Sequence, residues 1–300
     1  MERKVNTIID KDKCIGCGKC VKVCPSKTIS MLDGKAAVTG RSSINCGHCE
    51  QICPVDAITV TSLTKLEFNN FEADLTWLPP GQGDVSQLVR LMASRRSCRN
   101  FSDCPVDRTM LEDLVKIGTT APSATNSQDW TFTVLPEREQ VIAYGNLVVD
   151  FFCKINKLAK NIFVRNTLSF LGQKQLKMFY KKYTPYVDKA VDCWHSGEHD
   201  YLFHSAPAVI IIGGKNTASM PDADAQLATQ NILLAAHNMG LGSCLIGFAV
   251  KAMMNDKKIC KAIGGSANEQ FYSAIALGWP EEDYKYVCRR KNIVPIYPSL

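Results

Sequence analysis

Seven closely spaced cysteines constrain this chain more than any other feature. The chain has 300 residues and 14 cysteines, and half of these lie between Cys14 and Cys53 at short, regular intervals. Disulfides would suit an exported protein. However, the opening residues, MERKVNTIIDKDK, lack the apolar run of a secretory signal. We therefore expect a cytoplasmic protein whose clustered thiols bind metal.

The first cysteine run reads Cys-x2-Cys-x2-Cys-x3-Cys-Pro, from Cys14 to Pro25. Three thiolates within one tight loop can face three corners of one cubane iron-sulfur cluster, and Gly16 and Gly18 let the backbone wrap around it. The fourth thiolate, Cys24, points away and serves a second cluster. The alternative is a zinc ribbon made from two CxxC pairs, but zinc sites rarely use this run. The run resembles that of bacterial ferredoxins.

The second run, Cys-x2-Cys-x3-Cys-Pro, lacks the leading cysteine of a two-cluster ferredoxin, and Ser43 stands in its place. The crossover rule assigns a complete 4Fe-4S site to the first cluster. Its ligands are Cys14, Cys17, Cys20 and Cys53. The second cluster would take three thiolates, with Ser43 as an uncertain fourth ligand. Those thiolates are Cys24, Cys46 and Cys49.

A serine hydroxyl is a harder and less acidic ligand than a thiol, so the corner of the second cluster at Ser43 is the weak one. Three outcomes stay open. The site could hold a 4Fe-4S cube with a serine oxygen or solvent on one iron, a three-iron cluster on three thiolates, or no cluster.

The hydrophobic pattern divides the chain into an iron-sulfur domain over residues 1–60, a linker over 61–83 that ends in Leu-Pro-Pro-Gly-Gln-Gly, and a second domain over 84–300. In the second domain, helical spacing predicts helices near residues 85–92, 111–117 and 222–239, and apolar runs predict strands at 130–135, 208–212 and 271–277. We therefore predict an α+β domain with a central sheet.

Residues 154–204 read as a helical insertion. Between Lys154 and Lys189 the chain has nine Lys or Arg and one acidic residue, Asp188. A solvated basic face is the ordinary interpretation, and a lid or a docking surface for an acidic electron carrier is the alternative. The net charge of +6 forms no long basic run that would track nucleic acid, and no apolar stretch is long enough to span a membrane.

Four motifs of the second domain resemble, in order, those of FMN-dependent nitroreductases. They are Ser94-Arg95-Arg96-Ser97-Cys98-Arg99-Asn100-Phe101, Ala121-Pro122-Ser123-Ala124-Thr125-Asn126-Ser127-Gln128-Asp129-Trp130, Gly240-Leu241-Gly242-Ser243-Cys244-Leu245-Ile246-Gly247-Phe248, and Ala276-Leu277-Gly278-Trp279-Pro280 followed by Arg289-Arg290-Lys291. Closely spaced guanidinium groups and a hydroxyl supply charge-assisted donors for a phosphate dianion. Asp129 replaces the proline that is usual in the second motif. With the ferredoxin-like run, the chain resembles the ferredoxin-nitroreductase fusions found mostly in anaerobes.

The resemblance implies a mostly antiparallel central sheet, an FMN and a homodimer with FMN at its interface. It implies that the second motif lies on the flavin of the neighbouring subunit, that main-chain groups of Ile246 and Gly247 approach flavin N5, and that Arg99 lies near N1. No side chain stands out as the acid or base. The implied cofactor-binding residues are Arg95, Arg96, Ser97, Arg99, Pro122, Ser123, Ala124, Asn126, Gln128, Leu245, Ile246, Gly247, Arg289 and Arg290.

The resemblance also implies an oxidoreductase. Electrons would pass from reduced ferredoxin or NAD(P)H through the clusters to FMN, and then to a nitroaromatic, a quinone or a similar electron-poor acceptor. Reductive dehalogenation or enoate reduction on the same fold is an alternative, and a non-catalytic electron-transfer flavoprotein is another. The chain has no Gly-x-Gly-x-x-Gly fingerprint of a separate dinucleotide-binding domain.

Overall fold

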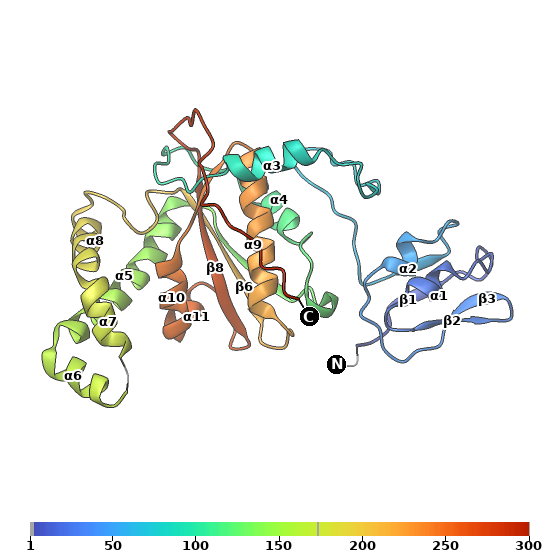
Figure 1. Ribbon diagram of the computed structural model, residues 1–300, viewed down its shortest axis with the longest axis horizontal. Coiled ribbons are helices and arrows are strands. Elements are labelled where there is room, and N and C mark those ends of the chain that lie inside the picture. Colours follow the sequence, from blue (N-terminus) through green and yellow to red (C-terminus); the bar gives the residue numbers. More distant parts are fainter. Residues whose placement is uncertain (1–2, 173, 300) are drawn as a thin grey trace.

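The computed structural model describes residues 3–172 and 174–299. A small N-terminal module, here called the ferredoxin module, lies at one end of the long axis, and a larger domain, here called the flavin domain, fills the rest (Figure 1). No helix of the described residues is long and apolar enough to cross a membrane.

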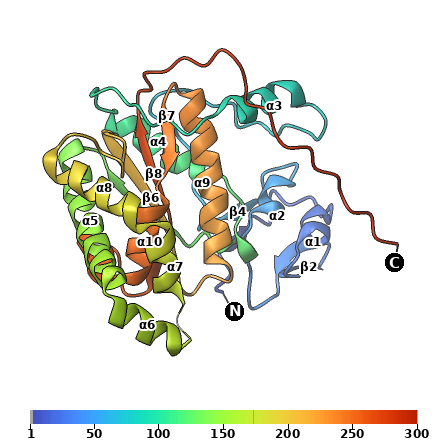
Figure 2. The same ribbon diagram turned by 60° about the vertical axis from the view of Figure 1, so that its left-hand side comes forward.

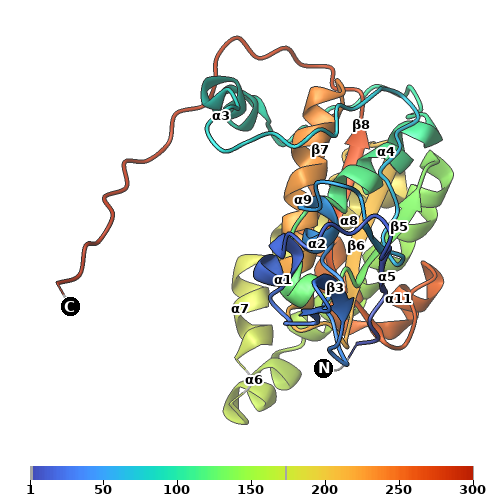
Figure 3. The ribbon, with the colours of Figure 1, turned by 90° about the vertical axis from the view of Figure 1, so that its right-hand side faces the viewer.

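The ferredoxin module consists of two short antiparallel hairpins and two short helices. Strand β1 (Thr7–Ile9) pairs with β4 (Ile58–Val60), and β2 (Ile29–Leu32) pairs with β3 (Lys35–Val38). Helices α1 (Lys19–Val23) and α2 (His48–Gln51) lie against each other (Figure 3). Each follows a glycine at positive φ, Gly18 at 70° and Gly47 at 77°, a backbone conformation that disfavours other residues.

The flavin domain is built on one four-stranded antiparallel sheet in the order β5-β6-β8-β7. These strands are β5 (Trp130–Leu135), β6 (Ala208–Lys215), β7 (Gly242–Leu245) and β8 (Glu269–Gly278). The predicted α+β class and mostly antiparallel sheet are confirmed, and each of the three predicted strands lies within an observed one.

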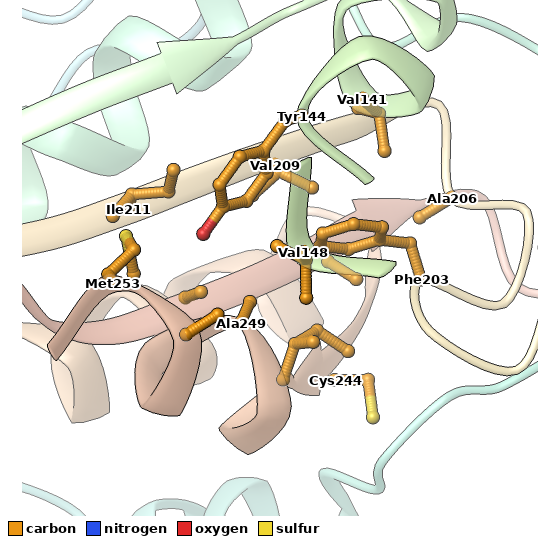
Figure 4. Packing of buried hydrophobic residues seen from close by; sticks show 14 of the residues in the cluster. Val141, Tyr144, Val148, Phe203, Ala206, Val209, Ile211, Cys244, Ala249 and Met253 are labelled. Atoms are coloured by element: carbon orange, nitrogen blue, oxygen red, sulfur yellow. The ribbon is translucent and has the colours of Figure 1, made fainter. Parts of the chain in front are cut away.

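Helices cover both faces of this sheet (Figure 2). Alternate residues of β6 enter different cores, because successive strand side chains point to opposite faces. On one face, Val209 and Ile211 pack with residues of α5 (Arg138–Lys160) and α10 (Gly247–Asn255) (Figure 4). On the other face, Ile210 packs with α4 (Arg108–Gly118) and α9 (Pro221–Asn238).

The remaining helices flank this core. Helices α6 (Ile162–Phe170), α7 (Gln175–Lys182) and α8 (Thr184–Ser196) follow α5, so the segment predicted as a helical insertion is helical. Its predicted start at residue 154 falls inside α5, which is one continuous helix from Arg138. Helix α11 (Lys257–Ala262) follows α10, and a single 3-10 turn, η1, spans Ala124–Asn126.

Two segments lie outside the compact core. Helix α3 (Val85–Ser94) crosses one end of α9 and buries none of its residues, although its apolar side chains share one face (Figure 1). Residues 281–299 contain no helix or strand; the segment begins against the flavin domain, where the N–H of Glu281 donates to the Asn100 carbonyl at 3.2 Å, and its end extends away from the domain (Figure 2). Both segments expose large apolar side chains, including Val89 and Ile296.

The predicted linker is anchored at its centre. The buried carboxylate of Asp113 on α4 accepts hydrogen bonds from the main-chain N–H groups of Asn69 and Asn70 at 2.8 and 2.9 Å, and from both of their side-chain amides. Lys116 donates to the carbonyl of Glu67 at 2.6 Å. The segment between the ferredoxin module and α3 is therefore held on the flavin domain.

Candidate functional site

The structure gathers the predicted ligands of the first cluster around one small cavity in the ferredoxin module. Cys14, Cys17 and Cys20 line it from the loop before and within α1, and Cys53 lines it from the segment after α2. Apolar side chains close the remainder. The cysteine that is distant in sequence thus joins the three of the first run, as the crossover rule predicts.

A second cavity contains the other predicted set. Cys24, Cys46 and Cys49 line it together with Ser43. The Ser43 hydroxyl accepts a hydrogen bond from the main-chain N–H of Asn45 at 3.0 Å. Ser43 therefore lines the cavity from the sequence position at which a two-cluster ferredoxin has its cysteine.

The two halves of the module repeat the same local geometry. Cys24 Sγ accepts from the N–H of Thr28 at 3.3 Å, and Cys53 Sγ accepts from the N–H of Ala57 at 3.2 Å. Main-chain donors stabilise the thiolate form of a cysteine that ligates iron.

The thiols of the two cavities differ in their ease of ionisation. Main-chain hydrogen bonds from Ala36 and Gly16 lower the pKa of Cys14, and Lys35 adds to the effect. Burial raises the pKa of Cys20 and Cys49. Because iron binds thiolates, loading the cavities would release protons from these two buried thiols.

The chemistry and spacing of these donors fit iron-sulfur clusters better than a single ion. In residues 3–172 and 174–299, no three His, Cys, Asp or Glu side chains converge closely enough to hold one metal ion. The thiolates of a zinc site meet at one atom, whereas those of a cubane cluster bind four separate irons and stand farther apart. The two sets of thiols that line the cavities are the donors that iron-sulfur clusters use.

Three of the four flavin motifs meet at one end of the sheet. Ser97 forms a bridge with Ser243 of β7, and the N–H of Cys98 donates to the Ser243 carbonyl at 3.0 Å. Phe101 forms a bridge with Pro280, which follows β8. The first, third and fourth motifs are thus adjacent in space although they are far apart in sequence.

A cavity at this end of the sheet, here called the guanidinium cavity, is lined by arginine side chains. Arg95 and Arg96 contribute to its wall, and burial, with repulsion from Arg96 and Arg290, lowers the pKa of Arg95. Over the described ranges no carboxylate lies within ion-pair distance of Arg95, Arg96 or Arg290. The buried Ser243 hydroxyl lines the same cavity and has no hydrogen-bond partner among the described atoms. The acidic residues Glu282 and Asp283 also line this cavity. Arginines without an ion pair beside an unsatisfied hydroxyl fit a phosphate.

The fourth-motif arginines separate in this geometry. Arg290 lies close enough to Arg95 to affect its pKa, and it also donates to the Cys288 carbonyl at 3.3 Å. No such effect on Arg95 comes from Arg289. Of the two, Arg290 is therefore the one whose charge reaches Arg95.

The segment predicted to approach flavin N5 is open on its outer side. Ile246 is buried, whereas Leu245 and Phe248 are about half exposed. A methyl group built on Gly247 would meet no atom within 4 Å. A flat ring could therefore approach the main chain here.

The charge of Arg99 affects the pKa of His204 in this region. Burial lowers the pKa of His204 and the Arg99 charge contributes, while Asp200 opposes the shift. The lowered pKa favours the neutral imidazole of His204. The residue also has a positive φ of 57°, which is uncommon for a residue other than glycine. No pattern in the sequence links Arg99 to His204.

The second motif lies at the start of α9, away from the other three motifs. Its loop is fixed to the start of α9, because the N–H of Ala124 donates to the Asp224 carboxylate at 2.9 Å and Trp130 Nε1 donates to the Asp224 carbonyl at 3.1 Å. His237, at the far end of α9, lines the guanidinium cavity. Thirteen residues separate these two positions, which is about 20 Å along a helix. Within one chain the loop does not meet the other three motifs.

The members of this loop have distinct contacts. The N–H of Gln128 donates to Ser123 Oγ at 3.0 Å, and Gln128 Nε2 donates to Asn126 Oδ1 at 3.1 Å. The Asn126 side-chain amide donates to the main chain of the ferredoxin module, at 3.1 Å to the Ile44 carbonyl. Pro122, which precedes them, makes no side-chain hydrogen bond.

Comparisons with known proteins agree with both parts of the chain. Residues 92–279 match the family model described as the nitroreductase family. The chain belongs to the nitroreductase family. Residues 6–54 match the model described as a 4Fe-4S dicluster domain. The predicted fusion of a ferredoxin module with a nitroreductase domain is confirmed, and so is its class as an oxidoreductase.

Individual relatives are distant. An Archaeoglobus fulgidus protein named as a candidate NADH dehydrogenase/NAD(P)H nitroreductase is 23% identical over 203 residues, which cover 66% of this chain and 88% of that protein. Iodotyrosine deiodinase of Danio rerio is 23% identical over 226 residues, covering 71% and 70%. The FMN-bound nitroreductase structure from Bacteroides fragilis covers 71% of this chain and 99% of its own, at 19% identity and a TM-score of 0.51.

Proposed function

We propose that the protein is an FMN- and iron-sulfur-dependent oxidoreductase. Electrons would pass from reduced ferredoxin or NAD(P)H through the clusters to FMN, and then to a nitroaromatic, a quinone or a similar electron-poor acceptor. One observation carries the proposal: a single chain has two cysteine-lined cavities and, in its nitroreductase domain, an unpaired guanidinium cluster.

The cysteines would hold the clusters as the cavities group them. Cys14, Cys17, Cys20 and Cys53 would bind a 4Fe-4S cluster. Cys24, Cys46 and Cys49 would bind the second cluster, with Ser43 oxygen or solvent at the fourth corner. A hard oxygen ligand bound through a weakly acidic hydroxyl makes that corner the most labile one.

The arginines and the β7–α10 segment would hold FMN. Arg95, Arg96, Ser97 and Arg290 would bind its phosphate, and the main chain at Ile246 and Gly247 would face the ring. FMN, when bound, accepts electrons singly and delivers two together. Arg99 would stabilise negative charge on the ring by its fixed positive charge.

A homodimer would complete this site. The second-motif loop is about 20 Å along α9 from the guanidinium cluster of its own chain, so in the proposed dimer a partner subunit would supply that loop to each flavin. The unpartnered apolar face of α3 supports a second copy, since Leu88, Val89 and Met92 are 48, 57 and 46% exposed. Exposed contiguous apolar surface of this kind marks an interface.

An aromatic-lined pocket supports an aromatic acceptor. Phe248, next to Gly247, lines it together with Phe152 on α5, Trp194 on α8 and Tyr201. A flat, electron-poor ring can stack on such side chains. A closed flavin with no pocket beside its ring would favour the non-catalytic alternative, and the open pocket at Phe248 counts against it. The deiodinase relative keeps reductive dehalogenation as the second candidate.

Anaerobic purification followed by donor and acceptor titration tests the proposal. We expect FMN, iron and acid-labile sulfide in the purified dimer, bleaching of the flavin absorbance by a donor, and its recovery on adding a nitroaromatic or a quinone. A halogenated aromatic that alone restores the absorbance would favour the second candidate. Colourless protein without FMN, iron or sulfide would refute both.

A further inference from the structure

Hydrogen bonds join the ferredoxin module directly to the second-motif loop. The Asn126 side-chain amide donates to the carbonyls of Ile44 and Asn45 at 3.1 and 3.2 Å. From the ferredoxin module, Arg3 Nη1 donates to the Asn126 carbonyl at 2.9 Å and Arg3 Nη2 donates to Thr125 Oγ1 at 2.8 Å. Each of the two segments therefore donates to the other.

The ferredoxin residues in this contact belong to the second cluster cavity. Asn45 immediately precedes Cys46, and both line that cavity with Ile44 and Ser43. The main-chain carbonyl of Arg3 accepts from the N–H of Ser43 at 3.1 Å. No residue of the first cavity takes part in a hydrogen bond to the loop within the described ranges. Hydrogen bonds therefore connect the loop to the cavity of the second cluster and not to that of the first.

The loop has the backbone of a rigid connector. Thr125, Asn126 and Gln128 have positive φ values of 55°, 53° and 51°. Such conformations cost free energy for residues other than glycine and persist when surrounding contacts hold them. Two contacts hold the loop. Arg3 donates to the Asn126 carbonyl, and the Asp224 carboxylate accepts from the N–H of Ala124.

We propose that the loop from Ala124 to Gln128 fixes the second cluster of one subunit next to the flavin of the partner subunit, so that electrons cross the dimer. Arg3 and Asn126 are the positioning residues. This inference rests on the proposed homodimer, in which the loop completes the partner's flavin site. It adds that the donor cluster and the flavin phosphate arginines belong to different chains.

The electron count closes with a one-electron donor of the ferredoxin class. Each transfer oxidises iron in the second cluster by one electron and reduces the flavin by one. Two transfers, with one proton from solvent, complete the two-electron reduction, and the external donor reduces the clusters again.

Mixed dimers distinguish the crossed route from a route within one chain. Cys46→Ala with Cys49→Ala removes the second cluster, and Arg95→Ala with Arg96→Ala removes the flavin. Different affinity tags isolate an opposed dimer, with the second cluster and the flavin site on different chains. They also isolate a same-chain dimer, in which one chain has both and its partner has neither. A dimer with one flavin and no second cluster gives the background.

We expect flavin absorbance to bleach at least tenfold faster in the opposed dimer than in the same-chain dimer, with reduced ferredoxin as the donor. The same-chain dimer should match the background. In an anaerobic crystal structure of the loaded wild-type dimer, the second cluster should lie closer to the partner's FMN than to that of its own chain. Faster bleaching in the same-chain dimer, or the reverse order of distances, would overturn the inference while leaving the oxidoreductase proposal intact.

Arg3→Met tests the hydrogen-bonded contact between the ferredoxin module and the second-motif loop, with Lys22→Met as its matched control. Lys22 is an exposed cation of the same module, and its side chain makes no hydrogen bond to the flavin domain among the described residues. We expect Arg3→Met to speed amide exchange in residues 124–128 and to slow flavin bleaching several-fold, with unchanged iron, sulfide and FMN content. The control should change neither.

Asn126→Asp is a second variant that tests the same contact. It keeps the size and the tolerance of positive φ, but a carboxylate cannot donate to the Ile44 and Asn45 carbonyls. FMN content is measured in parallel, because the resemblance also places Asn126 near the flavin. Wild-type exchange and bleaching rates in both variants would mean that the contact does not position the cluster. A monomeric holoprotein would refute both the crossed electron route and the homodimer.

Discussion

The ferredoxin module and the flavin domain are held together in different ways. Among the described residues of the module, the hydrophobic core cluster has six buried members, two of them proposed iron ligands: Cys20, Ile29, Ala36, Cys49, Ile58 and Val60. The flavin domain has two large cores, one on each face of its sheet. A core as small as that of the module rarely stabilises a fold without metal or disulfides.

The difference teaches where the cofactors matter for folding. In the module, cluster binding and folding are coupled, because the ligands are part of the core. In the flavin domain, the cofactor site lies at the end of the sheet, and apolar burial holds the strands whether or not the site is filled. Perturbations should therefore separate the two regions.

Removal of iron is expected to have the largest effect on folding. If the module stayed folded without iron, the proposed difference between the two regions would be wrong. Anaerobic chelation should leave residues 3–63 without protected amides, because their core loses the clusters that complete it. Residues 130–278 should keep their protection and the domain should keep its FMN. Hydrogen exchange followed by mass spectrometry measures both regions in one sample. Persistent protection of the iron-free module would show that its apolar core suffices.

A cavity in the core of the flavin domain should destabilise that domain and leave the ferredoxin module unaffected. Ile211 is fully buried on β6, so Ile211→Ala should lower the free energy of unfolding of this domain by about 2–5 kcal/mol. Iron and sulfide content should stay at the wild-type level. Ile142→Ala on α5, where the side chain is 40% exposed, is the matched control. Iron loss in Ile211→Ala, beyond that in the control, would mean that the two regions fold as one unit.

The parts of this fold that could be predicted from sequence have a local pattern. The apolar run at Ala208–Ile212 predicts a strand covered on both faces, and β6 is one. The helix predicted for 222–239 is α9, within one residue at each end. Apolar spacing is a property of neighbouring residues, so it survives without knowledge of tertiary contacts.

Contacts between distant segments left no such pattern. Asn126 and Ile44 are 82 residues apart and meet through one amide and one carbonyl. Asn69 and Asn70 read as ordinary linker residues, although Asp113 on α4 holds both. Hydrogen bonds of this kind depend on the packed fold and not on the spacing of residue types. The cysteines are the exception, because the crossover rule of ferredoxins encodes a distant contact in the motif itself.

The contact between Asp113 and the linker sharpens the comparison, because it ties the segment between the two regions to one of them. Asp113→Ala would remove a buried acceptor of hydrogen bonds from Asn69 and Asn70. We expect a loss of about 1–3 kcal/mol in the flavin domain and faster amide exchange in residues 67–70, measured by denaturation and exchange. Glu112→Ala is the control, because its exposed pair with Arg108 should contribute less than about 1 kcal/mol. An effect of equal size in both variants would contradict this role of Asp113.

The acid dependence of that contact is the smallest expected effect. Burial works to raise the pKa of Asp113, but hydrogen bonds from Asn69 and Asn70 and the charge of Lys116 outweigh it, so the pKa is lowered. A carboxyl with a lowered pKa in the folded state stabilises the fold above its ordinary pKa of about 4. That contribution disappears as the pH falls through the folded-state value.

The stability difference between wild type and Asp113→Ala should therefore be constant from pH 7 to about pH 5 and shrink below about pH 4. Urea denaturation of the flavin domain at a series of pH values measures it. Glu112→Ala, measured in the same series, corrects for the general effect of acid on the domain. A difference that grew on acidification would mean that Asp113 is held as the neutral acid, in which case its bonds to Asn69 and Asn70 would need another physical account.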